Sequence, residues 1–473
     1  MSSKIELKIE EALKNRQVQE NLPRALGHSR RARASSIGNV ENWEELRDHA
    51  SRVKKNALSR LDHYLVQLEQ SLQRAGAKVI WAKDSSEAVD FIVQLLHERG
   101  VTRVVKSKSM TTEEVNLNEE LEKAHVTPVE TDLGEYIVQL AGQKPFHLLA
   151  PALNFSAREV AQLFEQEIGM PYTEDERELT AMARKKLRWE FLNAGVGITG
   201  VNFAVAETGT LVLVENEGNI LLSTAGPPVH IALMGIEKVI PRLSDLPVFL
   251  RLLTRSATGQ PISSYVHFIT GSRCPDEPDG PEQLYVVLLD NGRSGILEDP
   301  YLSQTLNCIR CGACLNACPV YETIGGHAYG STYQGPIGAI LTPQLHSYKT
   351  ALNHPFASSL CGACGDVCPV KIEIPHILLK LRERIQNVHD ATASRLPLER
   401  YGFRLWAWFM TRSKRFEILS RWARRLQGVL FSGPALKLPF SPLRNWSRSR
   451  ELPRFSQESF RELYRKRRDR ESI

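Results

Sequence analysis

Apolar positions along the middle of the chain predict helices that alternate with strands. Residues 59–76 show an amphipathic helical pattern, and the β-rich run 77–82 follows them. Asp84-Ser-Ser-Glu87 then caps a predicted helix that ends at Gly100. The alternation continues to about residue 297. It predicts an α/β fold with a largely parallel, doubly wound sheet and helices on both faces.

The helical and strand patterns of apolar residues also predict the other elements of this region. Strands are predicted at 101–107, 146–150, 203–205, 210–215, 229–235, 266–271 and 284–290, and helices at 116–125, 156–167 and 183–193. Gly195-Val-Gly-Ile-Thr-Gly200 matches a dinucleotide fingerprint that must follow a strand and open a helix. Here the helix comes first and the strand second. We therefore expect neither a nicotinamide nor a flavin site at this loop.

The two ends of the chain carry different patterns. Residues 5–15 predict a helix, and Ser29-Arg-Arg-Ala-Arg33 predicts a solvated basic loop. Five residues of the tail recur at helical steps and predict one apolar helix face: Phe409, Phe416, Leu419, Trp422 and Leu426. We expect this face to dock on a partner protein. The alternatives are a membrane surface or packing on the chain itself.

Composition narrows the class of protein. The chain has 473 residues, 42% of them apolar, which suits two to four domains and excludes general disorder. We find neither an apolar run long enough for a membrane-spanning helix nor a signal core at the start. The sequence therefore predicts a soluble cytoplasmic protein, with the tail as the place for any peripheral contact with the inner face of the membrane.

The net charge of +6 is unevenly distributed. Residues 401–473 hold 18 Lys/Arg and 6 Asp/Glu, a net charge of +12, whereas residues 1–400 carry −6. An acidic partner or an anionic surface would therefore meet the tail. Because the tail lacks a readable nucleic-acid-binding motif, we do not expect DNA or RNA as a partner.

Seven of the eight cysteines lie in two short blocks, and the first block has the spacing of an iron–sulfur site. Cys308, Cys311, Cys314 and Cys318, followed by Pro319, match the bacterial ferredoxin run C-x2-C-x2-C-x3-C-P. In that run three thiolates hold one cluster and the fourth holds the other. A zinc ribbon needs neither the third cysteine nor the proline, and a disulfide framework is unexpected in a cytosolic chain.

The second block is one ligand short of that pattern. Cys361, Cys364 and Cys368 align with its last three ligands, and Ser358 falls at the first position. The crossed arrangement assigns Cys308, Cys311, Cys314 and Cys368 to a first [4Fe–4S] cluster, and Cys318, Cys361 and Cys364 to a second. The fourth position of the second cluster has three options: an oxygen of Ser358, a non-protein ligand, or a [3Fe–4S] cluster. We expect Cys274 to be an unligated surface or loop thiol, and the alternative is a remote ligand.

The cysteine blocks and a few polar loops suggest two chemistries. The 42 residues between the blocks suit a helical two-cluster domain, which indicates electron transfer. Lys106 and Lys108 lie between a strand and a helix, and Glu207 and Thr208 lie in a turn before a strand. Such positions suit an anion pocket for a small carboxylate or phosphate, although ordinary capping and turn chemistry explains them equally well.

Several of these stretches resemble one known family. Five motifs, followed by the two cysteine blocks, are similar to those of the lactate utilization protein B family: Lys106-Ser-Lys-Ser-Met110, Glu130-Thr-Asp-Leu-Gly134, Ala206-Glu-Thr-Gly-Thr210, Pro227-Pro-Val-His230 and Leu289-Asp-Asn-Gly292. The resemblance implies a lactate-utilization (LUD) domain, akin to sugar-isomerase and CoA-transferase folds, at 61–297. A helical extension at 1–60, a ferredoxin domain at 298–392 and a basic C-terminal domain at 393–473 would complete the chain.

The resemblance also implies a function. Members of that family take part in the oxidation of L-lactate to pyruvate, as an electron-transfer component that acts with two other proteins. The implied partners are a cysteine-rich subunit and a second LUD protein. Because the chain shows no convincing flavin or nicotinamide site, we expect the lactate-oxidising centre to lie elsewhere in the complex.

Overall fold

A six-stranded, wholly parallel sheet organises the larger part of the molecule. The computed structural model describes residues 4–346, 351–392, 398–430, 435–436 and 452–471. The strand order is β1 (Lys78–Ala82), β10 (Gln283–Leu289), β7 (Val229–Gly235), β4 (Val196–Thr199), β2 (Arg103–Lys106) and β3 (Thr127–Glu130). The strands are rich in Val, Ile and Leu, as expected when both faces of a sheet are covered. The predicted parallel α/β fold is confirmed.

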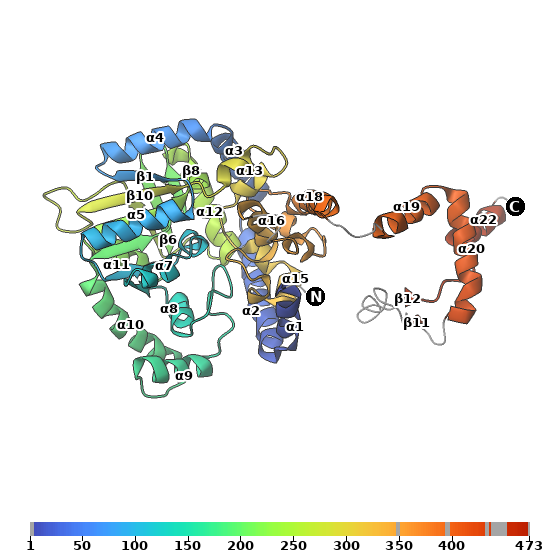
Figure 1. The fold of residues 1–473 in the computed structure, drawn as a ribbon, viewed down its shortest axis with the longest axis horizontal. Helices are drawn as coiled ribbons and strands as arrows, with labels where there is room; N and C mark the ends of the chain where they lie inside the picture. Colours follow the sequence, from blue (N-terminus) through green and yellow to red (C-terminus); the bar gives the residue numbers. More distant parts are fainter. Residues whose placement is uncertain (1–3, 347–350, 393–397, 431–434, 437–451, 472–473) are drawn as a thin grey trace. The chain divides into compact units, whose positions relative to one another are not determined.

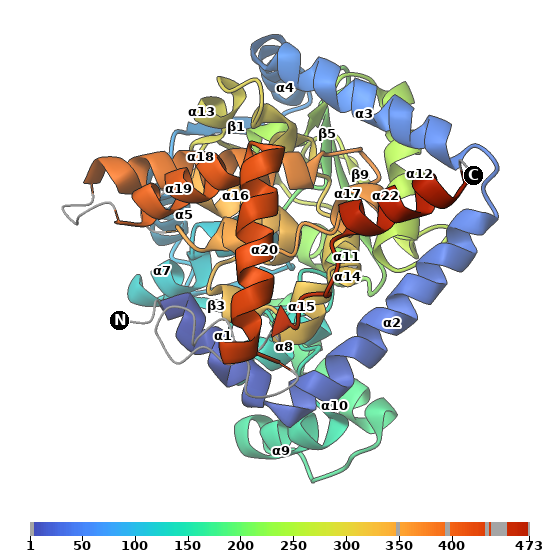
Figure 2. The same cartoon turned by 90° about the vertical axis from the view of Figure 1, so that its right-hand side faces the viewer.

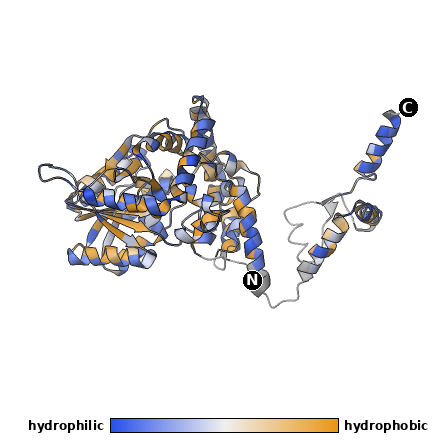
Figure 3. Ribbon diagram, turned by 90° about the horizontal axis from the view of Figure 1, so that it is seen from above, coloured by the Kyte–Doolittle hydropathy of each residue, from blue (hydrophilic) through white to orange (hydrophobic). Residues whose placement is uncertain are grey.

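Helices cover both faces of this sheet (Figure 1). In β10, Leu284, Val286 and Leu288 pack in one core with α4 (Leu61–Arg74). The intervening side chains of β10 pack in another core with α5 (Ser85–Glu98) and α7 (Leu117–Lys123). Hydrophobic strands flanked by amphipathic helices are visible in Figure 3. The alternation of side chains along a strand therefore places one apolar layer on each side.

Four other strands form a second sheet, which the sequence pattern did not separate from the first. Its order is β8 (Val239–Ile240), β5 (Phe203–Val205), β6 (Thr210–Glu215) and β9 (Tyr265–Ile269). A tight turn at Gly209, with a φ of +71°, returns β6 antiparallel to β5. Phe203 and Val205 pack in the same core as α12 (Leu246–Ala257) and the cysteine-bearing region. The second sheet thus joins the large sheet to that region.

The region of the two cysteine blocks is helical. Its helices are α13 (Arg293–Leu297), α14 (Ala313–Asn316), α15 (Pro319–Ile324), α16 (Gly335–Leu345), α17 (Ala363–Asp366) and α18 (Ile374–Thr392), with short 3₁₀ turns at Ser303–Asn307, His327–Tyr329 and His354–Phe356. The N-terminal helices α1 (Lys4–Lys14), α2 (Arg16–Gly38) and α3 (Trp43–Ser59) share its apolar core. Figure 2 shows α2 and α3 along this part of the molecule.

Two local predictions were wrong. Ser29–Arg33 is not a loop but lies within α2, where Arg30 and Arg33 bond to the cysteine-bearing region. Residues 146–150 form no strand, because Pro145 and Pro151 flank them and Phe146 N donates instead to Pro151 O at 2.8 Å. The hydroxyl of Tyr321 donates to Phe146 O at 2.8 Å. This segment is therefore a bend against the cysteine-bearing region.

The remaining helices of the larger unit surround the carboxyl ends of the parallel strands or link them. They are α6 (Met110–Glu114), α8 (Leu133–Leu140), α9 (Ala157–Ile168), α10 (Glu176–Asn193) and α11 (Asn219–Ala225), with 3₁₀ turns at Ile236–Lys238 and Leu243–Asp245. The G-x-G-x-x-G stretch contains β4 and follows α10, so it lacks the strand-then-helix order of a dinucleotide site. Ser156 and Glu159 form a capping box at the start of α9.

The contacts divide the chain into two compact units, Met1–His389 and Asp390–Ile473. The second contains α19 (Leu398–Met410), α20 (Ser413–Leu430), α22 (Phe460–Glu471) and the short pair β11 (Ala435–Leu436) and β12 (Leu452–Pro453). Arg424 and Glu462 form an ion pair of 2.8 Å between α20 and α22. Phe409 lies on α19 and the other four predicted apolar residues on α20, so the expected single face is split by a turn. Among the described residues, no helix is both long and apolar enough to cross a membrane.

Candidate functional site

The two cysteine blocks fold into the same local structure, fifty residues apart. In the first block Gly312, with a φ of +71°, opens α14, and in the second Gly362, with a φ of +92°, opens α17. The two short helices pack against each other. Each glycine adopts a left-handed backbone conformation and so turns the chain tightly. Only glycine adopts this conformation without a steric penalty. The blocks therefore form an internal repeat in which Cys308 corresponds to Ser358 and Cys318 to Cys368.

The structure brings four thiols from both blocks to one cavity. Cys308, Cys311, Cys314 and Cys368 line it, together with apolar side chains that include Ile337 and Ile372. Burial raises the pKa of the Cys314 thiol well above its usual value, and Cys308, Cys311 and Cys368 add to the rise. Burial also raises the pKa of Cys368 to about 11. Thiols that raise one another's pKa in this way suit a shared metal group, which binds them as thiolates.

Backbone N–H groups point at these sulfurs. Arg310 N donates to Cys308 Sγ at 3.4 Å, and Ile372 N donates to Cys368 Sγ at 3.4 Å. Such bonds stabilise thiolates and influence the reduction potential of a bound cluster. The set matches the first ligand group of the crossed arrangement, with three ligands from one block and one from the other.

A second group contains the other three thiols of the two cysteine blocks, Cys318, Cys361 and Cys364. Cys318 caps α15 and accepts from Tyr321 N at 3.5 Å. Burial raises its pKa, with a contribution from Cys361, and burial raises the pKa of Cys364 to about 12, with a contribution from Cys318. Cys361 is exposed, and a hydrogen bond from the Ser359 side chain lowers its pKa. The second group therefore lies nearer the surface of the unit than the first.

Ser358 has the local geometry of a ligand position. Its Oγ accepts from Leu360 N at 3.2 Å, just as Cys308 Sγ accepts from the backbone N–H two residues later. The left-handed φ of +57° at Leu360 corresponds to that of +60° at Arg310. Cys274 is exposed on a loop, where its backbone N–H donates to Glu277 Oε2 at 2.7 Å.

Basic side chains from distant parts of the chain surround the first thiol group. Arg47 of α3 donates to the carbonyl oxygen of Cys368 from Nε at 3.0 Å and from Nη2 at 2.8 Å. Arg33 of α2 donates to Val367 O at 3.0 Å. Arg310 Nη1 is buried and, within the described part of the chain, lacks a hydrogen-bond partner. A buried cationic atom beside four thiols fits a negatively charged cluster, so the residues present suit the iron–sulfur group.

A buried chain of ion pairs connects Arg310 to the large sheet. Arg310 Nη2 lies 3.2 Å from Glu237 Oε1, and Arg293 Nε lies 2.6 Å from Glu237 Oε2. Arg293 also makes a two-pronged bond to Glu114, with both distances 2.8 Å. Although burial opposes it, Arg293 and Arg310 lower the pKa of Glu237 to about 2. The sequence alone reveals neither these ion pairs nor the contacts of Arg33 and Arg47 with the cysteine-bearing region. The partners in each case lie far apart in the sequence.

The four residues of the expected anion pocket have two separate sets of partners. The buried ammonium of Lys106 lies 2.6 Å from Glu130 Oε1, and Lys108 Nζ donates to Leu149 O at 2.6 Å. Glu207 Oε2 accepts from Leu243 N at 3.0 Å, and the hydroxyl of Thr208 bonds to that of Thr210 at 2.7 Å. The recorded bonds of the two lysines share no partner with those of Glu207 and Thr208. The anion pocket stays a prediction.

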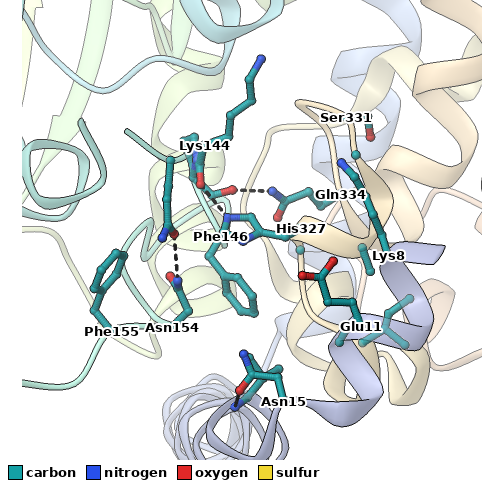
Figure 4. Close-up of a pocket in the computed structure, with 18 of the residues that line it drawn as sticks. Lys8, Glu11, Asn15, Lys144, Phe146, Asn154, Phe155, His327, Ser331 and Gln334 are labelled. Carbon is teal, nitrogen blue, oxygen red and sulfur yellow. Dashed lines mark hydrogen bonds between the residues drawn. The ribbon is translucent and has the colours of Figure 1, made fainter. Parts of the chain in front are cut away.

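A large cavity, lined by both polar and apolar side chains, lies beside the cysteine-bearing region. Its volume is about 730 Å³, and α1, the segment 143–146 and the turn at 326–334 line it. Figure 4 shows Lys8, Glu11 and Lys144 among its charged side chains. His327 Nε2 bonds to Lys144 O at 2.7 Å, and Gln334 Nε2 donates to Pro145 O at 2.6 Å. No motif of the sequence points to this cavity, because its wall comes from segments that lie far apart along the chain.

Comparison with known families agrees with this architecture. The model of the LUD domain matches residues 65–289, the model of the 4Fe-4S dicluster domain matches residues 304–372, and the model of the C-terminal domain of lactate utilisation protein B matches residues 380–469. The fold and the thiol groups therefore define an iron–sulfur protein that carries a LUD domain.

Relatives identify the family more closely. The chain is 42% identical to the Lactate utilization protein B of Bacillus cytotoxicus, over 92% of this chain and 90% of the relative. It is 41% identical, with the same coverage, to the proteins of that name from Bacillus cereus strain AH820 and Bacillus thuringiensis strain Al Hakam. The chain belongs to the lactate utilization protein B family, as the sequence motifs predicted.

One solved structure also aligns with the chain. It is a DUF162 family protein from Deinococcus radiodurans, and the alignment covers 48% of this chain and 98% of that protein. The identity is 14% and the TM-score is 0.28. The overlap is too weak to inform the fold.

Proposed function

We propose that this chain carries electrons in a lactate-utilisation system that oxidises L-lactate to pyruvate. The observation that carries the proposal is the pair of thiol groups that gather around the adjoining helices α14 and α17. The printed names of the relatives support the link to lactate use. Lactate oxidation releases two electrons and two protons, and an iron–sulfur cluster takes up one electron at a time. Two clusters could hold both electrons.

Each of the two thiol groups would hold one cluster. Cys308, Cys311, Cys314 and Cys368 would hold a [4Fe–4S] cluster in an apolar setting, shielded from water. Cys318, Cys361 and Cys364 would hold the second cluster, with Ser358 as the candidate fourth ligand. The exposure of Cys361 supports an exchange of electrons with a partner at the second group.

We further propose that the partners are a cysteine-rich subunit and a second LUD protein. The exposed aromatic side chains of the C-terminal unit, among them Trp406 and Trp422, support protein docking. The two-electron step at lactate would then take place in a partner, and this chain would pass the electrons on.

The test is an anaerobic assay with L-lactate and the two partner proteins. We expect lactate to reduce the clusters of this chain in the complete mixture, seen as bleaching of their visible absorbance. The variant Cys311→Ser should abolish reduction of the first cluster, whereas Cys274→Ser, a matched change at an exposed thiol, should leave it intact. Clusters that stay oxidised in the complete, lactate-oxidising mixture would refute the proposal.

The cavity of about 730 Å³ favours a second candidate function, in which the LUD domain itself binds or converts a small carboxylate. Lys8 lies at its wall and can offer an ammonium group to a carboxylate ligand, although Glu11, Glu113 and Glu159 also line the cavity. The isolated chain with intact clusters distinguishes the two functions. If the isolated chain neither binds lactate in calorimetry nor turns it over without the partners, this second function is eliminated.

A further inference from the structure

Three carboxylates converge at one edge of the large sheet. Glu130 ends β3, Glu113 lies on α6 and Glu135 lies on α8. One oxygen of each lies within 4.8 Å of an oxygen of the other two. The side chains of Glu130 and Glu135 are nearly inaccessible, since the residues are 1% and 4% exposed. Buried carboxylates are costly unless a cation or a proton compensates them.

One lysine compensates part of this charge. Lys106 Nζ lies 2.6 Å from Glu130 Oε1 and 3.3 Å from Glu113 Oε1, and it donates to the hydroxyl of Thr112 at 2.9 Å. Three carboxylates and one ammonium leave a formal charge of −2.

Several oxygens of the group lack partners. Within the described part of the chain, Glu130 Oε2, Glu135 Oε1 and Asn118 Oδ1 are buried and accept no hydrogen bond. Asn118 Nδ2 donates to Glu130 Oε1 at 2.8 Å, which holds this amide against the carboxylates. All three residues line a cavity of about 220 Å³, and Glu113 lines it too. The cavity therefore presents unpaired oxygen acceptors beside a net negative charge.

We propose that this cavity binds a hard divalent cation, Mg²⁺ or Mn²⁺, through Glu113, Glu130, Glu135 and the amide oxygen of Asn118. Oxygen ligands are those that these ions prefer, whereas the softer metals select sulfur and imidazole. The charge of a divalent cation balances the charge of −2 that Lys106 leaves. The role of Lys106 is then to neutralise the third carboxylate and to hold Glu130 in place.

The position of the site suggests what the cation does. Glu113, Lys144 and Pro145 line both this cavity and the larger one of about 730 Å³. The cation therefore lies next to the larger cavity, where a carboxylate ligand entering it can complete the coordination shell. This inference is independent of the proposed electron transfer, because it concerns residues of the LUD domain alone.

The test is a titration of the full chain, with its clusters intact and bound metal first removed by a chelator. Free Mn²⁺ is followed by its paramagnetic resonance signal at room temperature, and Mg²⁺ is added as a competitor. We expect one Mn²⁺ per chain, displaced by Mg²⁺. Glu135→Gln should weaken binding at least about tenfold, since it removes one carboxylate ligand. It keeps the side-chain volume and spares the ion pair with Lys106.

The matched control is Glu122→Gln, at an exposed carboxylate on the rim of the same cavity. This variant should bind Mn²⁺ like the unmodified chain, and the thermal midpoints of both variants should show that they fold. Failure of the unmodified chain to bind Mn²⁺ at millimolar concentration would overturn the proposal, and so would unchanged binding by Glu135→Gln. Either result would mean that no metal is held through Glu135, and that a proton on Glu135 lowers the negative charge of the cluster instead.

Discussion

Ser358 stands where the second cysteine block would otherwise supply its first thiolate. Serine oxygen is harder and more basic than thiolate and is rarely deprotonated at neutral pH, so it should hold iron less firmly. We predict that mild oxidation converts the second cluster to [3Fe–4S] while the first persists. The paramagnetic resonance spectrum of air-exposed protein should show the three-iron signal, and Ser358→Cys should suppress it.

The control for this experiment is Cys274→Ser, which changes the number of thiols outside both groups. It should leave the three-iron signal unchanged. Two equally oxidation-resistant [4Fe–4S] clusters in the unmodified protein would contradict the prediction and would indicate another fourth ligand.

Arg310 should set the potential of the first cluster. Its guanidinium is buried next to Cys308, and Cys308, Tyr333 and Glu237 raise its pKa despite its burial, so it stays charged. A fixed positive charge favours the reduced, more negative cluster. We predict that Arg310→Gln lowers the reduction potential by roughly 60 mV, which is a tenfold change for a one-electron couple.

The matched variant is Arg310→Lys, which keeps the charge and should keep most of the potential. Redox titration monitored by paramagnetic resonance measures both. Equal shifts in the two variants would mean that packing, not charge, is what Arg310 provides.

Residues of the site could be predicted where their partners are close in sequence. The first block alone indicates iron–sulfur chemistry, because a loop that offers three thiolates to one cluster needs short, fixed gaps. Arg47 could not be found in this way, since its bond to Cys368 spans 321 residues. The same holds for Glu135, whose chemistry depends on Glu113 and Glu130 being folded against it.

At the scale of elements, the bend at 146–150 depends on one neutral histidine. Leu149 N and Ala150 N donate to His147 Nδ1 at 3.1 and 3.3 Å, so Nε2 carries the proton and donates to Asn316 Oδ1 at 3.0 Å. Burial lowers the pKa of His147 from 6.5 to about 4. The unfolded chain therefore binds a proton that the folded chain excludes, and stability falls as pH drops below 6.5.

We predict that His147 accounts for a loss of about 1 kcal/mol of stability between about pH 7.5 and 5.5. The slope of thermal midpoint against pH should be smaller in His147→Gln than in the unmodified protein. His376→Gln, at a residue whose side chain is 77% exposed, is the control and should leave the slope unchanged. An unchanged slope in His147→Gln would contradict the prediction.

Helices and strands could be predicted where a clear repeat of apolar residues is bounded by a capping residue or a turn. The capping residue Asp84 and the strand Val229–Gly235 lie where the pattern places them. The segment 146–150 is apolar enough for a strand, but its hydrogen bonds go to Pro151 and Tyr321 instead of to a sheet. The pattern shows only which residues are buried, not which partner buries them.

At the scale of the whole molecule, the C-terminal unit should be needed for assembly but not for the clusters. All seven cysteines of the two groups lie in the unit Met1–His389. We predict that a chain ending at Thr392 keeps its visible cluster absorbance and loses co-purification with the two partners. Arg461→Gln, which removes one exposed ion pair of the tail, is the control and should assemble normally. Unchanged assembly of the shortened chain would exclude the tail as the docking element.

The bond from Arg47 to Cys368 also has a consequence for biosynthesis. The helices α2 and α3 leave the ribosome before the loop that they bind, because Cys368 is made 321 residues after Arg47. At cellular rates of translation, that interval is about 15–60 s. During it, the apolar faces of these helices have no final partner, which exposes the nascent chain to aggregation. The N-terminal helices therefore cannot close onto this loop before the second cysteine block has been made, and a shortage of iron should show itself as a folding defect.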